Sequence, residues 1–302
     1  MTDFRALSIL LPSYNNDCRP LIRALSAQAA QLEARGIACE IVVYDDCSTC
    51  RAMAHANSEL CGQLPLCRYV QGERNVGRSA ARNRLVGEAR HDMLLFIDSD
   101  LMPVADDFLA RYADAPEADA VVGGLAVGGA DGCGTLRSNL RYMYERKAAM
   151  RGDAAARSRH RYASFHVSNL LVRRSVMTAH PFDESIRRYG YEDVLLGKDL
   201  ERDGVSVEHI DNEVRFAHFD DNAAFLAKTE EGLATLHDMR DQLRGYSGVQ
   251  TLVERLQRLH VLPVARLAYR LMRGALRRNL MGRNPSLVAF AAYRVGFYAS
   301  LC

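Results

Sequence analysis

The sequence predicts an α/β fold in which a mostly parallel sheet is flanked by helices, followed by a C-terminal helical extension. Short apolar runs alternate with stretches of helical periodicity over the first two thirds of the chain. The runs are continuously apolar, as is typical of strands covered on both faces. Polar residues follow directly where the runs end. Ligands of open α/β sheets bind beyond the carboxyl ends of the strands, so we expect a functional site there.

Composition is that of a globular protein, with 48% apolar and 25% charged residues in a chain of 302. No apolar run reaches the ~20 residues that a transmembrane helix needs. Eight cysteines and no signal peptide predict a reducing, cytoplasmic compartment without disulfides. A zinc site made of Cys47, Cys50, Cys61 and Cys67 is not favoured, because the second pair has the wrong spacing.

The chain opens with a strand–helix–strand unit. Residues 7–11 predict a buried strand that ends at Pro12, and the polar residues Tyr14 and Asn15 follow it. A helix extends to Gly36, and residues 40–44 form the next strand, which leads into Asp45 and Asp46. Two parallel strands joined by a helix form a βαβ unit.

The central strand is predicted over residues 93–97 and leads directly into Asp98 and Asp100. Before it come a helix over 49–60, a strand over 68–70, and a helix rich in small residues that starts after Asn75 and points N–H groups at an anion. Side chains two positions apart on an extended segment leave on one side, so both carboxylates can bind one hard divalent cation. The alternative is an acidic strand exit without a ligand.

The remaining elements bring further polar residues to element ends. We expect helices over 103–112 and 137–151, strands over 120–127, 205–210 and 214–217, and a strand over 165–172 that carries His166 and Asn169. Glu192 and Asp193 precede the apolar positions of another helix. The helix dipole favours acidic residues there, so a structural cap explains them as well as a catalytic role does. A histidine on an alternating strand is also often structural.

Five clusters in this order resemble the family 2 glycosyltransferases, which have a GT-A fold. They are Pro12-Ser13-Tyr14-Asn15, Val43 to Thr49, Asn75-x-Gly77 with Ala81-Arg82-Asn83, Phe96 to Asp100, and Glu192-Asp193. The resemblance covers the chain from residue 7 to about residue 200. Cys47 stands where the family often has glycine and Cys50 where it often has aspartate, so we expect that turn to differ in shape.

The resemblance implies transfer of a sugar, with inversion, from a nucleoside-diphosphate sugar to an acceptor hydroxyl. Mn²⁺ or Mg²⁺ is the implied cofactor, and UDP is the nucleotide we expect. The residues implied in nucleotide binding are Pro12, Tyr14, Asn15, Asp45, Asp46, Asn75, Gly77, Arg82 and Asp98. Asp98, Asp100 and His218 are implied in metal binding, Asp193 with Glu192 in base catalysis, and His166 and Asn169 on the acceptor side.

Two alternatives stay open. One is a catalytically silent GT-A-like protein that binds nucleotides or glycans. The other is a sugar nucleotidylyltransferase, which would be expected to have a Gly-rich loop and a basic residue after the first strand, where this chain has Pro12-Ser13-Tyr14-Asn15. The leading hypothesis is a metal-dependent glycosyltransferase that builds a cell-surface glycan or a lipid-linked saccharide.

The C-terminal region differs from the rest of the chain. We expect a catalytic domain over residues 1–220 and an amphipathic helical region over 221–302, in which nine arginines and no acidic residue follow Glu254. Basic amphipathic helices suit the surface of an anionic bilayer, so we expect peripheral contact with the inner face of the cell membrane. Packing against the enzyme's own core or a second subunit is the alternative. No nucleic-acid-binding motif accompanies the basic charge.

Overall fold

The computed structural model describes residues 4–128, 136–149 and 152–302. The chain divides into two compact units. The first comprises Met1–Ala126, Gly152–Arg187 and Leu196–Ala217, and the second comprises Val127–Arg151, Arg188–Leu195 and His218–Cys302. Each unit has its own apolar core and is described separately below.

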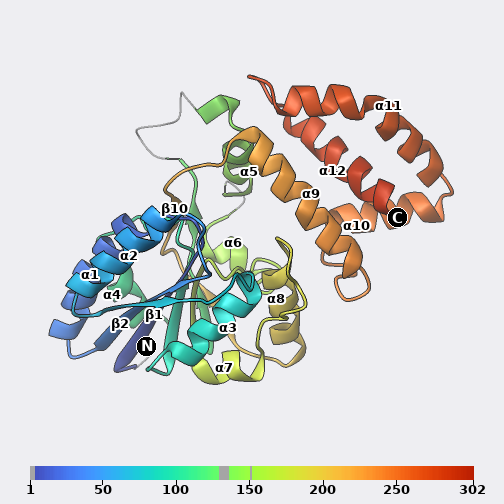
Figure 1. The fold of residues 1–302 in the computed structure, drawn as a ribbon. Helices are drawn as coiled ribbons and strands as arrows, with labels where there is room; N and C mark the ends of the chain where they lie inside the picture. Colours follow the sequence, from blue (N-terminus) through green and yellow to red (C-terminus); the bar gives the residue numbers. More distant parts are fainter. Residues whose placement is uncertain (1–3, 129–135, 150–151) are drawn as a thin grey trace. The chain divides into compact units, whose positions relative to one another are not determined.

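The first unit contains a sheet of seven strands in the order β3-β2-β1-β4-β8-β6-β9 (Figure 1). Its strands are β1 (Ala6–Ser13), β2 (Ala38–Asp45), β3 (Cys67–Gln71), β4 (Met93–Ile97), β6 (Ala120–Val122), β8 (Asn169–Arg173) and β9 (Val207–His209). Neighbouring strands pair in parallel except that β8 runs antiparallel to both β4 and β6. The predicted mostly parallel α/β fold is therefore confirmed.

Helices cover both faces of this sheet (Figure 1). They are α1 (Arg19–Ala34), α2 (Arg51–Gln63), α3 (Arg78–Glu88), α4 (Phe108–Ala113), α6 (Ala154–Ser158), α7 (Arg174–Ala179) and α8 (Glu192–Arg202). Leu7, Ile9 and Leu11 of β1 pack with α1, α2 and α4, whereas Leu10 lies in a second cluster with α3, α7 and α8. Successive strand residues point to opposite faces, so burial of both faces accounts for the continuously apolar runs.

Several predicted elements differ from the structure. The strand predicted over 120–127 ends at Val122, and Leu125–Ala126 forms a separate strand of another sheet. Residues 165–168 are not a strand, because β8 begins at Asn169, which pairs with Ile97, the last residue of β4. The helix predicted over 103–112 begins only at Phe108, since Leu101–Pro103 forms strand β5. β5 belongs to a small sheet with β7 (Leu125–Ala126) and β10 (Val214–Phe216), in the order β5-β10-β7. Long-range strand pairing decided these differences.

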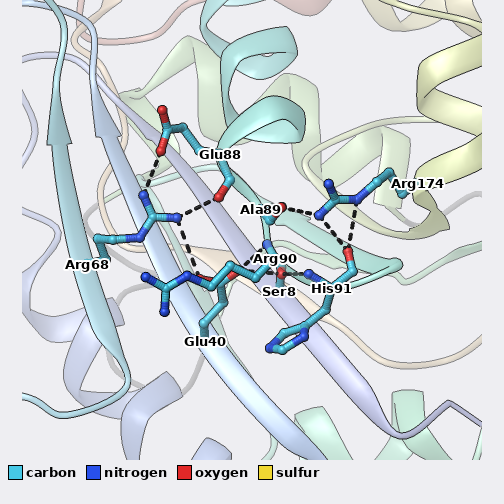
Figure 2. A network of polar contacts seen from close by, with 8 residues as sticks. All are labelled: Ser8, Glu40, Arg68, Glu88, Ala89, Arg90, His91 and Arg174. Carbon is cyan, nitrogen blue, oxygen red and sulfur yellow. Dashed lines mark hydrogen bonds and ion pairs between the residues drawn. The ribbon is translucent and has the colours of Figure 1, made fainter.

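A polar network joins the sheet at the amino-terminal end of β1 and β2 (Figure 2). The buried carboxylate of Glu40 accepts hydrogen bonds from Ser8 Oγ at 2.7 Å and from the backbone N–H of Arg90 at 2.6 Å. The guanidinium of Arg174 donates to the carbonyl oxygens of Ala89 and His91. The network therefore fixes the connection from α3 to β4 at the edge opposite the predicted site.

The second unit is helical. It contains a 3₁₀ turn (Leu136–Ser138) and the helices α5 (Leu140–Ala149), α9 (Asn222–Asp238), α10 (Gly248–Arg258), α11 (Leu262–Leu280) and α12 (Leu287–Leu301). One apolar cluster joins Leu140 of α5 to Phe225, Phe290 and Tyr293, and another joins α9 and α10 to the end of α12. In the part of the chain that the structure describes, no helix is long and apolar enough to cross a bilayer.

Candidate functional site

The carboxyl ends of β1 and β2 lie side by side, because the parallel register pairs Ser13 with Asp45. Asn15 links the two strand ends: its carboxamide accepts from the N–H of Cys50 at 2.8 Å, and its backbone N–H donates to Ser48 Oγ at 2.8 Å. Tyr14, which precedes Asn15, is 47% exposed. This edge therefore presents an aromatic ring beside a turn held by hydrogen bonds.

Asp45 is buried at the end of β2 and holds its own surroundings in place. One carboxylate oxygen accepts from the backbone and side chain of Ser48, and the other accepts from the Tyr69 hydroxyl at 2.7 Å. Sequence reasoning missed Ser48 and Tyr69 as partners. A carboxylate at the end of a buried strand needs hydrogen-bond donors, so the sequence indicated that Asp45 would have partners. Sequence spacing could not predict that one of these donors would come from β3.

Asp46 connects the end of β2 to the start of α3. Its carboxylate oxygens accept the backbone N–H groups of Val76 at 2.8 Å and Gly77 at 2.9 Å, and the Asn75 side chain donates to the Asp46 carbonyl oxygen at 3.2 Å. Burial raises the pKa of Asp46 and outweighs these backbone hydrogen bonds, which act to lower it. Gly77 has a φ of +88°, a conformation that favours glycine.

A cavity of about 360 Å³ adjoins this segment. Asn75 and Gly77 contribute to its lining together with three arginines, Arg74, Arg84 and Arg187. Glu184 is the acidic residue among the lining side chains. The sequence pattern pointed to an anion near Asn75 and Gly77, but Arg187 is distant in sequence and only folding brings it here.

Asp98 lies one residue beyond β4 and forms an ion pair with Arg82 of α3, with Nη2 and Oδ1 2.8 Å apart. The Arg82 side chain is 4% exposed and its guanidinium lies 5.6 Å from the centroid of the Phe182 ring. Burial acts to raise the pKa of Asp98, but the positive charges of Arg82 and Arg78 outweigh it and hold that pKa below its usual value. Asp98 is therefore ionised at neutral pH.

Asp100 follows in the turn between β4 and β5. Its carbonyl oxygen accepts the backbone N–H of Ala217 at 2.9 Å, and its neighbour Ser99 accepts from the Asn16 side chain at 3.2 Å. His218 is the next residue after Ala217 and begins the last segment of the second unit. Asp98 and Asp100 thus lie at the strand ends, as the sequence predicted.

The fit of a divalent cation follows from the chemistry of this donor set. Over residues 4–128, 136–149 and 152–302, no three His, Cys, Asp or Glu side chains gather closely enough to hold a metal ion by themselves. Magnesium is commonly bound through one or two carboxylates plus substrate phosphates and water. The hard oxygens of Asp98 and Asp100 fit such a cation when a diphosphate supplies the remaining ligands.

Glu192 and Asp193 occupy the first turn of α8, as expected. Glu192 is 7% exposed, and an Asp193 carboxylate oxygen accepts the backbone N–H of Val194 at 2.8 Å. Their segment, Arg188–Leu195, belongs to the second unit, whereas the rest of α8 belongs to the first. Their catalytic assignment stays a prediction.

The two residues assigned to the acceptor side have different surroundings. His166 is half-buried, with Nδ1 3.0 Å from Ser168 Oγ, and burial lowers its pKa to about 4. Asn169 is fully buried. Its amide donates to the carbonyl oxygens of Gly124 and Asn212, and its side-chain oxygen accepts from the Tyr112 hydroxyl. These contacts favour a structural role for Asn169, and an acceptor-side role for both residues stays a prediction.

Comparison with curated proteins gives a relative of known pathway. The chain is 34% identical over 131 residues to the succinoglycan biosynthesis protein ExoO of Rhizobium meliloti (strain 1021). The match covers 42% of this chain and 35% of ExoO, so the chain spans about a third of that relative's length.

Solved structures share the fold. The mannosyltransferase PcManGT from Pyrobaculum calidifontis, in complex with GDP-Man and Mn²⁺, aligns over 99% of this chain and 87% of its own, with a TM-score of 0.59 and 14% identity. TarS from S. aureus, in complex with UDP-GlcNAc, aligns over 97% and 89% respectively, with a TM-score of 0.52 and 16% identity.

The family model of glycosyl transferase family 2 matches residues 8–176, which is more than half of the chain. The match includes β1 to β4 and the polar residues that follow each of them, from Tyr14 to Asp100. The chain therefore belongs to glycosyl transferase family 2.

Proposed function

We propose that this protein is a metal-dependent, inverting glycosyltransferase that moves a sugar from a UDP-linked donor to an acceptor hydroxyl on a cell-surface glycan or a lipid-linked saccharide. The observation that carries the proposal is the carboxyl edge of the sheet, where Asp98, ion-paired with Arg82, is followed by Asp100. Membership of family 2 supports the reaction class.

The nucleoside part of the donor is assigned to the ends of β1 and β2. Pro12, Tyr14 and Asn15 line this pocket in the proposal, and the exposed Tyr14 ring offers an apolar surface to a base. Asp45 and Asp46 already accept hydrogen bonds from protein groups. A carboxylate has about four acceptor sites, so either residue can also accept an N–H of the base.

The diphosphate is assigned to the edge formed by β4 and α3. Asp98 and Asp100 hold Mn²⁺ or Mg²⁺ in the proposal, with His218 as a further ligand and Asn75, Gly77 and Arg82 on the nucleotide. The cation supplies electrostatic stabilisation of the charge that grows on the leaving nucleoside diphosphate. The Arg82 ion pair fixes the orientation of the Asp98 carboxylate before a ligand arrives.

The acceptor hydroxyl must lose its proton as it attacks the anomeric carbon. We propose that Asp193 is the base that accepts this proton. Glu192 lies beside it in the first turn of α8. The helix dipole favours negative charge at this position, and a carboxylate within hydrogen-bond reach of the hydroxyl can take its proton. His166 and Asn169 are assigned to the acceptor side.

The acceptor class rests on the relative ExoO, which is named for the biosynthesis of a polysaccharide. A saccharide that is carried on a lipid is extended at the membrane that holds this lipid. The proposal therefore places the enzyme at the cytoplasmic face of the cell membrane, with the C-terminal helices in peripheral contact with the bilayer.

Thermal unfolding with a panel of nucleoside diphosphates, in the presence of Mn²⁺, Mg²⁺ or EDTA, tests the donor site first. A ligand that binds only the folded state raises the melting temperature by mass action. We expect the largest shift with UDP and loss of that shift in EDTA. GDP is the main competitor, because the two solved neighbours carry UDP-GlcNAc and GDP-Man. A folded sample that no nucleotide shifts would contradict the transferase assignment.

Three variants separate the roles. Asp100→Ala is expected to abolish the metal-dependent shift, whereas Asp193→Asn keeps it and lowers turnover by roughly 10²–10⁴. Asp106→Ala, at an exposed carboxylate near the pair in sequence, is the matched control and should change neither quantity. Intact turnover in Asp193→Asn would show that another group takes the proton, while leaving the donor site in place.

A further inference from the structure

Helix α11 lies beside α12 in the second unit (Figure 1), and one of its apolar faces is buried there. Leu262, Tyr269 and Leu280 are buried, and the Tyr269 ring lies 5.7 Å from that of Tyr293 on α12. A Cβ atom at Gly296 of α12 would lie only 2.3 Å from the Tyr269 ring. The two helices therefore meet closely, and the packing role expected of an amphipathic helix is fulfilled by this face.

A second set of apolar side chains on α11 faces solvent. Val264, Leu267 and Leu271 are 67%, 48% and 76% exposed. Residues spaced by three or four positions share a helix face, so these three lie in one row. We call the row with its flanking apolar residues the exposed α11 stripe; its members are Val264, Leu267, Ala268, Leu271, Met272 and Ala275, and all six are exposed. Contiguous exposed apolar surface marks an interaction site.

Positive charge accompanies the stripe. Arg270, Arg273 and Arg278 of α11 are exposed, whereas Arg266 and Arg277 donate to Ala299 and Glu230 inside the unit. No acidic residue occurs in the sequence after Glu254. Arg270 lies three positions after Leu267, and Arg278 lies three positions after Ala275, so these two arginines border the stripe, whereas Arg273 lies on the other side of α11. The border of the stripe therefore carries positive charge from α11, and neither α11 nor α12 contributes an acidic side chain. A partner that covers it must be apolar in the middle and negatively charged around that centre.

We propose that the exposed α11 stripe docks on an anionic lipid bilayer, with Leu267 and Leu271 in the acyl boundary and Arg270 and Arg278 at the phosphate headgroups. The inference deepens the proposed function, on which it rests, by naming the residues that make the membrane contact. An interfacial helix combines an apolar face with an arginine-rich polar face, as α11 does. A second copy of the chain fits less well, because the same positive charges would face each other across a two-fold interface.

The test is co-sedimentation of the full chain with vesicles of phosphatidylglycerol and phosphatidylcholine, and with vesicles of phosphatidylcholine alone. We expect binding to the anionic vesicles, which decreases as salt is raised. The double variant Leu267→Asp with Leu271→Asp should bind at least roughly tenfold more weakly than the wild type, because both leucine side chains lose their apolar contact with the bilayer. Val104→Asp, which changes a 48% exposed valine in the first unit, is the matched control and should bind like the wild type.

A second pair of variants keeps the test independent of folding. If circular dichroism shows that the aspartates disturb the helices, Leu267→Ser with Leu271→Ser replaces them and is expected to weaken binding in the same direction. Arg270→Glu with Arg278→Glu should remove the preference for anionic over neutral vesicles. Equal binding by the wild type and the folded leucine variants would overturn the proposal.

Self-association would also overturn it. If the wild type ignores anionic vesicles but sediments as a dimer that the leucine variants dissociate, the stripe is an interface between two copies. The nucleotide-dependent shift in melting temperature is measured on the same samples. A wild type that shows the nucleotide-dependent shift but does not bind anionic vesicles contradicts only the docking proposal. A wild type that binds the vesicles but shows no nucleotide-dependent shift contradicts only the donor-site proposal.

Discussion

Cys47 has a backbone φ of +59° in the turn after β2. This left-handed region suits glycine and costs other L-residues energy through their Cβ atom. The turn therefore keeps a glycine-like conformation although it carries a cysteine. The Cys47 Sγ lies 3.6 Å from the carbonyl oxygen of Glu73, a weak contact. Strain at this position is compatible with the hydrogen bonds that hold Asp45 and Ser48.

Replacing Cys47 by glycine is expected to stabilise the fold. Relief of the left-handed conformation gains ~1–2 kcal/mol, and the greater freedom of glycine in the unfolded chain offsets ~0.5–1 kcal/mol, so the net gain is about 0.5–1 kcal/mol. Urea unfolding measures it. Cys47→Ser keeps the Cβ atom and should show no gain; equal stabilisation by both variants would mean that the thiol, and not the backbone, is unfavourable.

His166 makes stability depend on pH. Burial lowers its pKa to about 4, whereas an unfolded histidine titrates near ~6.5. The unfolded chain therefore binds the proton first, so the contribution is complete above about pH 6.5 and is lost as pH falls toward 4. Between pH 7 and pH 5 we expect wild type to lose on the order of 1 kcal/mol more unfolding free energy than His166→Gln. An equal loss of unfolding free energy in the wild type and in His166→Gln would contradict the lowered pKa of His166.

At the scale of elements, the polar network around Glu40 joins β1, β2, β3, the connection from α3 to β4 and the start of α7 at the amino-terminal edge of the sheet (Figure 2). Arg68 of β3 lies 3.6 Å from the Glu40 carboxylate and donates to the side chain and carbonyl oxygen of Glu88 at the end of α3, at 2.6 Å each. Parallel strands have no hairpin to fix their spacing. A shared buried carboxylate therefore helps to hold β1, β2 and β3 in place.

Removal of the Glu40 carboxylate is expected to destabilise the fold. Glu40→Ala leaves Ser8 and the Arg90 N–H without their acceptor and should lower the unfolding free energy by about 2–4 kcal/mol. Glu88→Ala, at a 43% exposed carboxylate of the same network, should cost less than ~1 kcal/mol. Urea titration compares them, and the nucleotide-dependent thermal shift should survive in both. An equal loss of unfolding free energy in Glu40→Ala and Glu88→Ala would mean that the buried Glu40 carboxylate contributes no more to stability than an exposed one.

At the scale of the whole molecule, the two compact units interleave along the chain. Helix α5 groups with the C-terminal helices although the β8 strand of the first unit follows it in sequence. Leu140 is fully buried in the same cluster as Phe225 and Phe290, and the rings of Tyr144 and Phe290 lie 5.4 Å apart. The second unit therefore depends on segments from both sides of the predicted boundary at residue 220.

Truncation after residue 220 is expected to expose this face of α5. Leu140 and Tyr144 lose their partners, so the shortened chain should aggregate or bind a hydrophobic dye more than the full chain does. Light scattering and dye fluorescence measure this. Adding Leu140→Ser and Tyr144→Ser to the shortened chain should restore its solubility. If the truncated chain stays soluble and does not bind the dye even without the two serine substitutions, residues 1–220 fold independently.

The sequence by itself determined the sheet and the edge at which its polar residues emerge. Continuous apolar runs such as Leu94 to Ile97 are required by burial on both faces, and the polar residues that follow them must then emerge at one edge. The position of Asp98 and Asp100 directly after β4 was predicted in this way. Local patterns suffice here, because burial of a strand is decided by its own side chains.

Only the tertiary structure decided what pairs with what. Nothing local predicts that β8 enters the sheet antiparallel between β4 and β6, that Asn169 is buried there, or that Arg187 joins the cavity beside Gly77. The exposed α11 stripe is the clearest case. Leu262 and Leu271 are alike in a periodic pattern, but one is buried and the other is 76% exposed. Periodicity records that a helix has apolar faces, and only packing between distant segments decides which of them is covered.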